Sequence, residues 1–146
     1  MRISEERVLA AVPSEVWRLL TSWEDQGRWM KDVDSIRVRS RAREGVGVRV
    51  AARTLVFGVP LFTDEIEVTL WDPPRRLVIA HRRFVRGTGT WSLIPAGQGT
   101  RFRWTEDVRI RVPLLGPIAL VVYRPRLRRL MRGALADLSV LASGRE

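Results

Sequence analysis

The chain has 146 residues, no cysteine and one histidine, and a formal net charge of +10 at pH 7. This length suits a domain with a core of its own, and we expect a single domain over residues 1–146. The lack of cysteine excludes disulfides and thiolate metal sites, and the single histidine argues against a histidine-based metal centre. The sequence therefore predicts no metal and no cofactor.

The positive charge is carried almost entirely by arginine, because Lys31 is the only lysine among the 26 basic residues. A genome rich in G and C produces such a bias without any function behind it. A basic chain is also attracted to nucleic acid or anionic lipid. The arginines are scattered along the chain and interleaved with acidic residues, which argues against a nucleic-acid partner. A basic binding module stays open as the third functional hypothesis.

The N-terminal residues, Met1 to Glu6, lack the apolar core of a signal peptide. The longest apolar run, from Val112 to Tyr123, is shorter than a membrane span and contains two prolines. We therefore expect a cytoplasmic protein without a transmembrane segment, and a homodimer remains open.

The first third of the chain predicts a strand followed by two short helices. Ser4 to Val12 alternates as a strand does, and Pro13 then interrupts it. Ser14 is expected to cap a helix that ends near Thr21-Ser22. A second short helix is expected from about Trp23 to Lys31. Neither helix is long enough to be stable alone, so both must pack against the sheet.

From Ser35 to Ile110 the hydrophobic pattern has a period of two, which predicts a series of strands. Ile36, Val48, Ile66 and similar residues alternate with charged residues, which gives the sheet one apolar and one arginine-rich face. The predicted turns are Glu44-Gly45, Gly58-Val59-Pro60, Asp72-Pro73-Pro74 and the segment 95–99. Short turns between successive strands are typical of an antiparallel meander.

The C-terminal segment, from Gly116-Pro117 to Ala142, predicts a long amphipathic helix. Pro125 lies inside the pattern and predicts a kink or a break. The arginines between Arg124 and Arg132 fall mainly outside the apolar stripe and are expected to face water. The stripe consists of Leu120, Tyr123, Leu127, Leu130, Ala134, Leu138 and Leu141.

These elements predict an α+β fold. A strongly curved antiparallel sheet of about six to seven strands wraps around the long C-terminal helix, which closes its open side. The two short helices follow the first strand.

Several short motifs, in this order and spacing, resemble the polyketide cyclase/dehydrase-like branch of the START/Bet v 1 (SRPBCC) superfamily. They are Pro13-Ser14-Glu15-Val16-Trp17, Trp29-Met30, Trp71-Asp72-Pro73-Pro74-Arg75-Arg76-Leu77, Gly99-Thr100-Arg101-Phe102 and the helix register from Gly116 to Leu138. The resemblance covers nearly the whole chain. It implies the helix-grip fold with a deep cavity for hydrophobic ligands between sheet and helix. It does not imply an activity, because the superfamily contains carriers, sensors and cyclases.

The residues expected to line that cavity are those that share the inward-facing pattern of the strands and the helix. They are Trp29, Val50, Ile66, Val68, Ile79, Trp91, Phe102, Trp104, Leu120, Tyr123, Leu127 and Met131. The alternative for each of them is that it simply fills the core. We expect Trp29, Trp91, Trp104 and Tyr123 to converge as aromatic walls, which suit a flat apolar ligand.

His81 and Glu106 share the inward pattern of their strands, and each is a candidate to orient a ligand or to act as an acid or base. The alternative is that both lie solvated beyond the covered part of the sheet, or that one pairs with an arginine. The sequence shows no other catalytic motif. The leading hypothesis is a hydrophobic small-molecule binding protein, and the alternative is a polyketide cyclase/aromatase-like enzyme that uses these two residues.

Overall fold

The computed structural model describes residues 1–110 and 115–144. These described residues form two α-helices, one short 3₁₀-helix and seven strands. In chain order these are β1 (Arg2–Leu9), α1 (Pro13–Thr21), η1 (Trp23–Arg28), β2 (Val33–Val38), β3 (Arg49–Val56), β4 (Val59–Asp72), β5 (Arg76–Arg82), β6 (Val85–Ala96), β7 (Gly99–Ile110) and α2 (Leu115–Ala142).

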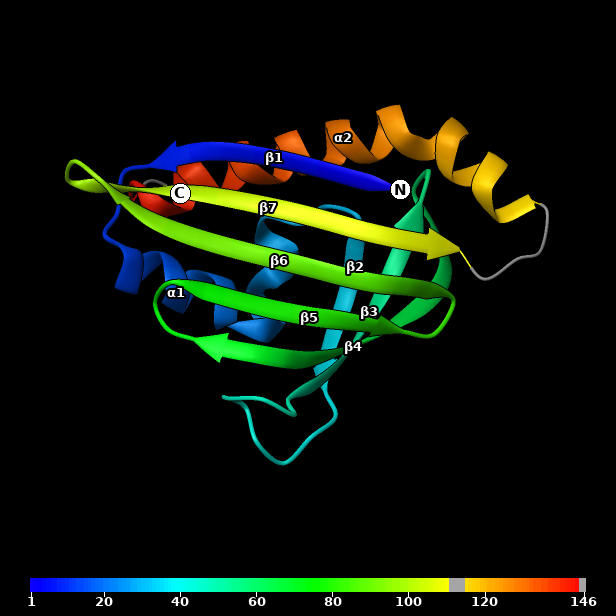
Figure 1. Ribbon diagram of the computed structural model, residues 1–146, viewed down its shortest axis with the longest axis horizontal. Coiled ribbons are helices and arrows are strands. Elements are labelled where there is room, and N and C mark those ends of the chain that lie inside the picture. The colour runs from blue at the N-terminus through cyan, green and yellow to red at the C-terminus, as the bar shows by residue number, and fades with distance from the viewer. Residues whose placement is uncertain (111–114, 145–146) are drawn as a thin grey trace.

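The seven strands form one antiparallel sheet in the order β1-β7-β6-β5-β4-β3-β2. The strands β2 to β7 form a meander, and β1 joins it at the far edge beside β7. Figure 1 shows the sheet curving, with α2 running along β1 and β7. The predicted α+β helix-grip architecture is confirmed. Its curvature follows from the twist that every strand carries.

The helix α2 packs most extensively against β1, β7 and α1. Its most buried residues are Met131, Ala134, Leu135 and Leu138. Leu130, which the predicted stripe placed in the core, is only half-buried. The helix is therefore rotated slightly from the predicted orientation, because it rests on one edge of the sheet and not on its centre.

The structure corrects two local predictions about the helices. Pro125 lies within α2, which continues through it, so of the predicted kink or break the break is wrong. Pro125 and Val121, whose carbonyl loses its helical partner, are on the exposed side of the helix, where water can replace the lost hydrogen bond. Ser14 does not cap α1, because Val12 occupies the N-cap position and no side chain bonds there.

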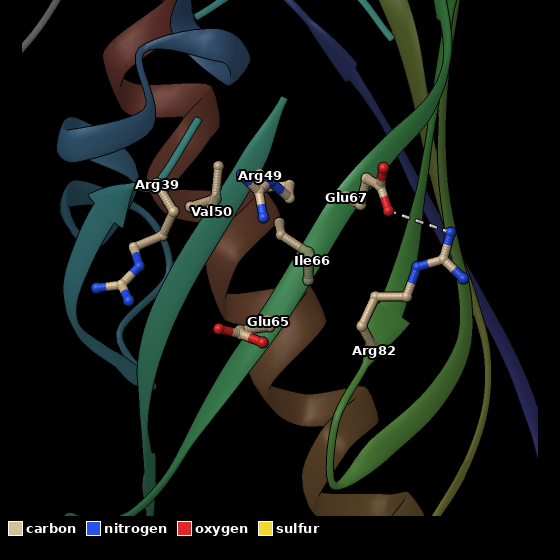
Figure 2. A pocket seen from close by; sticks show the side chains of 7 residues that line it. All are labelled: Arg39, Arg49, Val50, Glu65, Ile66, Glu67 and Arg82. Atoms are coloured by element: carbon tan, nitrogen blue, oxygen red, sulfur yellow. Dashed lines mark ion pairs between the residues drawn. The ribbon is translucent and has the colours of Figure 1, made fainter. Parts of the chain in front are cut away.

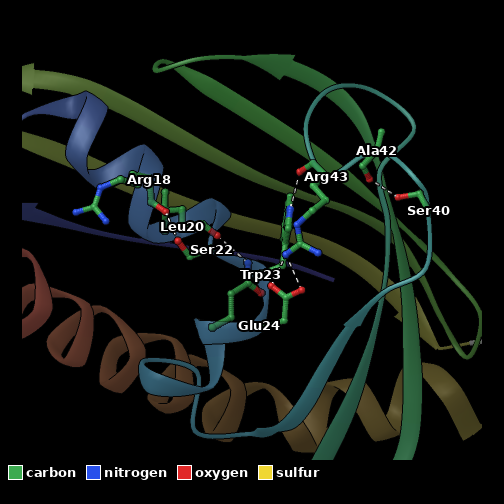
Figure 3. Close-up of polar contacts among 9 residues, drawn as sticks. Arg18, Leu20, Ser22, Trp23, Glu24, Ser40, Ala42 and Arg43 are labelled. Atoms are coloured by element: carbon green, nitrogen blue, oxygen red, sulfur yellow. Dashed lines mark hydrogen bonds and ion pairs between the residues drawn. The ribbon is translucent and has the colours of Figure 1, made fainter.

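The two short helices are anchored by polar contacts as well as by burial. The indole Nε1–H of Trp23 donates to the carbonyl oxygen of Arg43 at 2.9 Å, and Arg43 pairs with Glu24 (Figure 3). Gln26 is buried and donates to the carbonyl oxygen of Leu20 at 2.8 Å. These contacts tie the loop between β2 and β3 to η1, so that η1 closes one end of the curved sheet.

No helix among the described residues is long and apolar enough to cross a membrane. Residues 112–114, which belong to the apolar run considered above, lie outside the described part of the chain.

Candidate ligand-binding site

A buried polar cluster lies on the concave face of the sheet, built from His81 on β5, Asp64 on β4 and Glu106 on β7. The Nδ1 atom of His81 is 2.6 Å from Asp64 Oδ2, and its Nε2 atom is 2.9 Å from Glu106 Oε2. The three side chains are 12–13% exposed. We refer to these three residues as the His81 cluster.

Strand pairing brings the cluster together. Ile66 on β4 is paired with His81, so Asp64 lies diagonally across from the imidazole on the same face. Glu106 lies two strands away, beyond β6, where its partner is Gly89. A Cβ atom on Gly89 would lie 2.9 Å from Glu106 Oε1. The glycine therefore leaves the space through which Glu106 reaches His81.

The two carboxylates determine the charge of the imidazole. Burial by itself would lower the pKa of His81, but the hydrogen bonds to Asp64 and Glu106, together with their negative charges, raise it to about 10. At neutral pH the ring is an imidazolium that donates both of its N–H groups. It has no lone pair with which to accept a proton, so in this state it does not act as a base.

The cluster leaves one of its polar atoms without a partner. The Nε1–H of Trp104 donates to Glu106 Oε1 at 2.8 Å, which occupies the second oxygen of that carboxylate. Asp64 Oδ1 is buried and has no hydrogen-bond partner among the described residues. The same holds for Trp29 Nε1 and Arg126 Nε, so two buried donors and one buried acceptor are unsatisfied.

Further polar groups face the interior from the segment before β2 and from α2. Burial raises the pKa of Asp32, and the charge of Glu106 adds to that rise. Burial likewise raises the pKa of Tyr123, with a contribution from Asp32, while Arg126 acts in the opposite direction. Asp32 therefore lies within electrostatic range of both Glu106 and Tyr123, and Arg126 lies within range of Tyr123.

The two halves of the interior differ in how tightly they are filled. Beneath η1 the ring of Trp29 lies 5.9 Å from that of Trp91 and 6.1 Å from that of Trp104, and all three are buried. This half is solid core. Toward the first half of α2, several inward-facing residues are only half-buried, among them Ala52, Ile66, Tyr123 and Leu127. These side chains therefore keep part of their surface accessible to solvent, unlike the tryptophans.

The turn between β3 and β4 meets α2 at the open half. Phe57 at this turn has a positive φ of 52° and is 69% exposed. Its ring centre lies 6.2 Å from that of Tyr123, and the guanidinium carbon of Arg126 is 4.7 Å from the Phe57 ring centre. The residues Phe57, Tyr123 and Arg126 thus form a rim, which we call the Phe57 rim.

The residues predicted to line a cavity divide between these two halves. Val50, Val68, Ile79, Phe102 and Met131 are buried in the main core beside the three tryptophans. Tyr123 does not join those tryptophans and contacts Phe57 instead. Leu120 lines a separate hollow of about 370 Å³ with Met1, Ile110 and Pro117, near the start of α2. Ile66 and Leu127 border the open half.

Sequence reasoning found His81 and Glu106 but missed three polar residues of this interior. Asp64 lies two residues before Ile66, so the same alternation that selected Ile66 and Val68 would have found it. Asp32 lies in a turn, and Arg126 lies beside the apolar stripe of the helix, and neither position gives a periodic signal. The ligand-binding role of the residues that the sequence analysis assigned to the cavity remains a prediction.

The arginines of α2 are less available to a polyanion than the sequence suggested. Arg128 and Arg132, expected in water, both pair with Glu5 on β1, at 2.9 Å and 3.2 Å. Arg124 donates to the carbonyl oxygen of Arg2, and Arg126 turns toward Phe57. Arg129 stays exposed. The helix arginines therefore serve mainly to attach α2 to the rest of the molecule.

A shallow depression of about 240 Å³ lies outside the His81 cluster and has charged walls (Figure 2). Two residues of the predicted cavity, Val50 and Ile66, contribute to its lining. The other lining residues are charged, namely Arg39, Arg49, Glu65, Glu67 and Arg82, and Glu67 pairs with Arg82 at 3.3 Å. Its polar walls do not suit an apolar ligand. Among the residues that the structure describes, no group of three His, Cys, Asp or Glu side chains is arranged to hold a metal ion.

Known structures share this fold. The protein TTHA0849 from Thermus thermophilus is 23% identical, with a TM-score of 0.81 and coverage of 99% of this chain and 98% of that one. The Zhui aromatase/cyclase from a Streptomyces species is 16% identical, with a TM-score of 0.83 and coverage of 98% and 93%. A START superfamily protein from Mycobacterium smegmatis is 13% identical, with a TM-score of 0.72 and coverage of 98% and 97%.

No curated protein matches the chain in sequence. The sequence model described as polyketide cyclase / dehydrase and lipid transport matches residues 1–142, which is nearly the whole chain. The resemblance noted from the short motifs is thereby confirmed, and this protein belongs to the polyketide cyclase / dehydrase and lipid transport family.

Proposed function

We propose that this protein binds a hydrophobic small molecule between the concave face of the sheet and the first half of α2. The observation that carries this proposal is the contrast between the two halves of the interior. The half beneath η1 is filled by tryptophan rings. In the other half, inward-facing residues from β3, β4 and α2 are half-buried, and the Phe57 rim borders them.

The walls of this half favour an apolar ligand that carries a few polar groups. Ile66, Leu127 and the rings of Tyr123 and Phe57 offer apolar surface. The unsatisfied Asp64 Oδ1 offers one buried acceptor for a hydroxyl or N–H group of the ligand. A mostly apolar site with a few placed polar groups is typical of small-molecule binding proteins. The family description, which includes lipid transport, supports the same function.

A cyclase/aromatase-like activity is the second candidate. Its support is the inward position of His81 and Glu106 and the presence of an aromatase/cyclase among the similar structures. The engagement of both His81 nitrogens argues against acid–base catalysis, because a ligand would first have to displace a carboxylate. If the protein is an enzyme, His81→Asn should lower turnover of an aromatic polyketide without a matching loss of binding.

Two neighbouring alanines on β3 provide a matched test of binding. Ala52 faces inward opposite Asp64, whereas Ala51 faces outward opposite Glu65. Ala52→Trp should fill the open half and weaken binding of the fluorescent apolar probe N-phenyl-1-naphthylamine by about tenfold or more, which corresponds to about 1.4 kcal/mol. Ala51→Trp should leave the affinity of this probe nearly unchanged.

Thermal melts of both variants would show that each is folded before the titrations are compared. Native mass spectrometry of the wild-type protein would show whether a hydrophobic molecule is carried through purification. Equal probe affinity in the wild type and Ala52→Trp would contradict a binding site in the open half.

A further inference from the structure

We propose that Arg126 is the anchor for an acidic group, so that the ligand is an amphipathic organic acid whose apolar body lies in the open half. This inference deepens the proposed function and rests on it. It assigns the class of the ligand and a residue that selects it.

Arg126 differs from the other arginines of α2 in its surroundings. Arg128 and Arg132 have a carboxylate partner in Glu5, and Arg129 points to solvent. Arg126 is half-buried, and among the described residues it forms no ion pair. Its Nε atom is buried without a hydrogen-bond partner. A guanidinium N–H that is removed from water and left unpaired is unfavourable, and an incoming acceptor would relieve that cost.

The neighbours of Arg126 prepare it for a planar anion. The ring of Phe57 covers one face of the guanidinium, with 4.7 Å between the guanidinium carbon and the ring centre. When an aromatic ring covers the face of a guanidinium, the N–H groups along the guanidinium edge remain directed outward. These N–H groups can donate hydrogen bonds to two oxygens of a carboxylate or sulfonate. Tyr123 adds an apolar ring and a hydroxyl group next to Arg126. Burial raises the pKa of Tyr123, and the charge and side-chain hydrogen bond of Arg126 act against that rise.

The acidic groups that the structure describes in this interior leave the charge of Arg126 unpaired. Asp32 is the acidic group that shares the neighbourhood of Tyr123 with Arg126. No ion pair joins Asp32 to Arg126 among the described residues. Asp64 and Glu106 are engaged with the imidazolium of His81 deeper in the interior. The acidic head of the ligand is thus placed at the Phe57 rim, and its apolar body extends inward past Leu127 and Ile66.

A matched pair of probes tests this inference. The probe 8-anilino-1-naphthalenesulfonate has the aromatic frame of N-phenyl-1-naphthylamine with one sulfonate added. Wild-type protein should bind the sulfonate more tightly than the neutral probe. Arg126→Gln should weaken binding of the sulfonate by about 10- to 100-fold, the range for loss of a charge-assisted hydrogen bond. The same variant should change the affinity for the neutral probe about twofold at most, because only the anionic contact is lost.

Arg129→Gln is the control, because it removes the same charge from the same helix at an exposed position. It should leave the affinities for both probes unchanged. Arg126→Lys keeps the charge but loses the bidentate edge, and it should retain only part of the preference for the sulfonate. Circular dichroism of each variant establishes that it is folded.

The outcomes separate the two proposals. If the wild type binds both probes equally, or if Arg129→Gln weakens the sulfonate as much as Arg126→Gln does, the acid anchor is refuted and the binding site stands. If the wild type binds neither probe saturably, the proposed function and this inference both fail.

Discussion

The protonated His81 should make the stability of this protein depend on pH in a way that few single residues do. The folded-state pKa of His81 is raised from 6.5 to about 10. Protonation therefore stabilises the folded state fully below pH 6.5, and this contribution is lost as the pH rises through about 10. At about 1.4 kcal/mol for each pH unit, the full contribution is about 5 kcal/mol, and about 3 kcal/mol of it disappears between pH 7 and pH 9.

His81→Gln should remove this dependence. At pH 6.5 the variant should be less stable by about 3–5 kcal/mol, because Asp64 and Glu106 are left facing each other without the cation between them. Above pH 9 the wild type and the variant should approach each other in stability.

The assay is urea denaturation followed by tryptophan fluorescence between pH 5.5 and about 9.5, a range that spans the pKa of free histidine and most of the raised one. The two proteins are compared at each pH, so that titration of the N-terminus or of tyrosine cancels. Asp64→Asn is a second variant that keeps the imidazole but lacks one of the charges that raise its pKa. Its loss of stability should therefore end at a lower pH than in the wild type and be smaller in total. If the unfolding free energies of the wild type and His81→Gln change with pH in parallel, the conclusion that His81 is charged in the folded protein is refuted.

Three further predictions follow from packing. Leu138→Ala should destabilise the protein by about 2–5 kcal/mol, the range for a buried leucine. Val140→Ala, on the exposed side of the helix, should change the unfolding free energy by about 0.5 kcal/mol or less. Chemical denaturation measures both changes. Glu5→Gln should lower the unfolding free energy by about 1.5–3 kcal/mol, because it weakens the contacts to Arg128 and Arg132 of α2. If the loss is no larger than that caused by the same substitution at an exposed glutamate, Glu5 does not have this role. Gly89→Ala should push the Glu106 carboxylate away and reduce the pH dependence assigned to His81, which the same denaturation series would detect.

The sequence alone determined the order of the elements and the face on which most side chains lie. The alternation from Ser35 to Ile110 was sufficient to predict the strands, because one face of the sheet is buried. Every second residue of such a strand faces the core, so a period of two shows which residues these are. The same pattern placed His81 and Glu106 on the inward face, where the structure has them. The spacing of leucines after Leu120 was sufficient to predict the long helix, because apolar residues that recur with a period of 3.6 lie on one face of a helix and that face is buried.

The tertiary structure alone decided which of these side chains meet. Periodicity is a local property, whereas the contact between His81 and Asp64 depends on the register of β4 against β5. The contact with Glu106 depends in addition on a glycine in β6 that leaves the intervening space open. The raised pKa of His81 follows from these two contacts. It could not be predicted from the neighbouring sequence, because burial and the charge of a carboxylate on another strand depend on the folded structure.

The position of α2 was decided in the same way. A helix with apolar residues on a broad face can rest on the sheet in several rotations that differ little in periodicity. The pairing of Arg128 and Arg132 with Glu5 holds α2 against β1, and this places Met131 and Leu138 in the core and turns Arg126 toward Phe57. These contacts join residues more than a hundred positions apart, and only the folded chain brings them within reach.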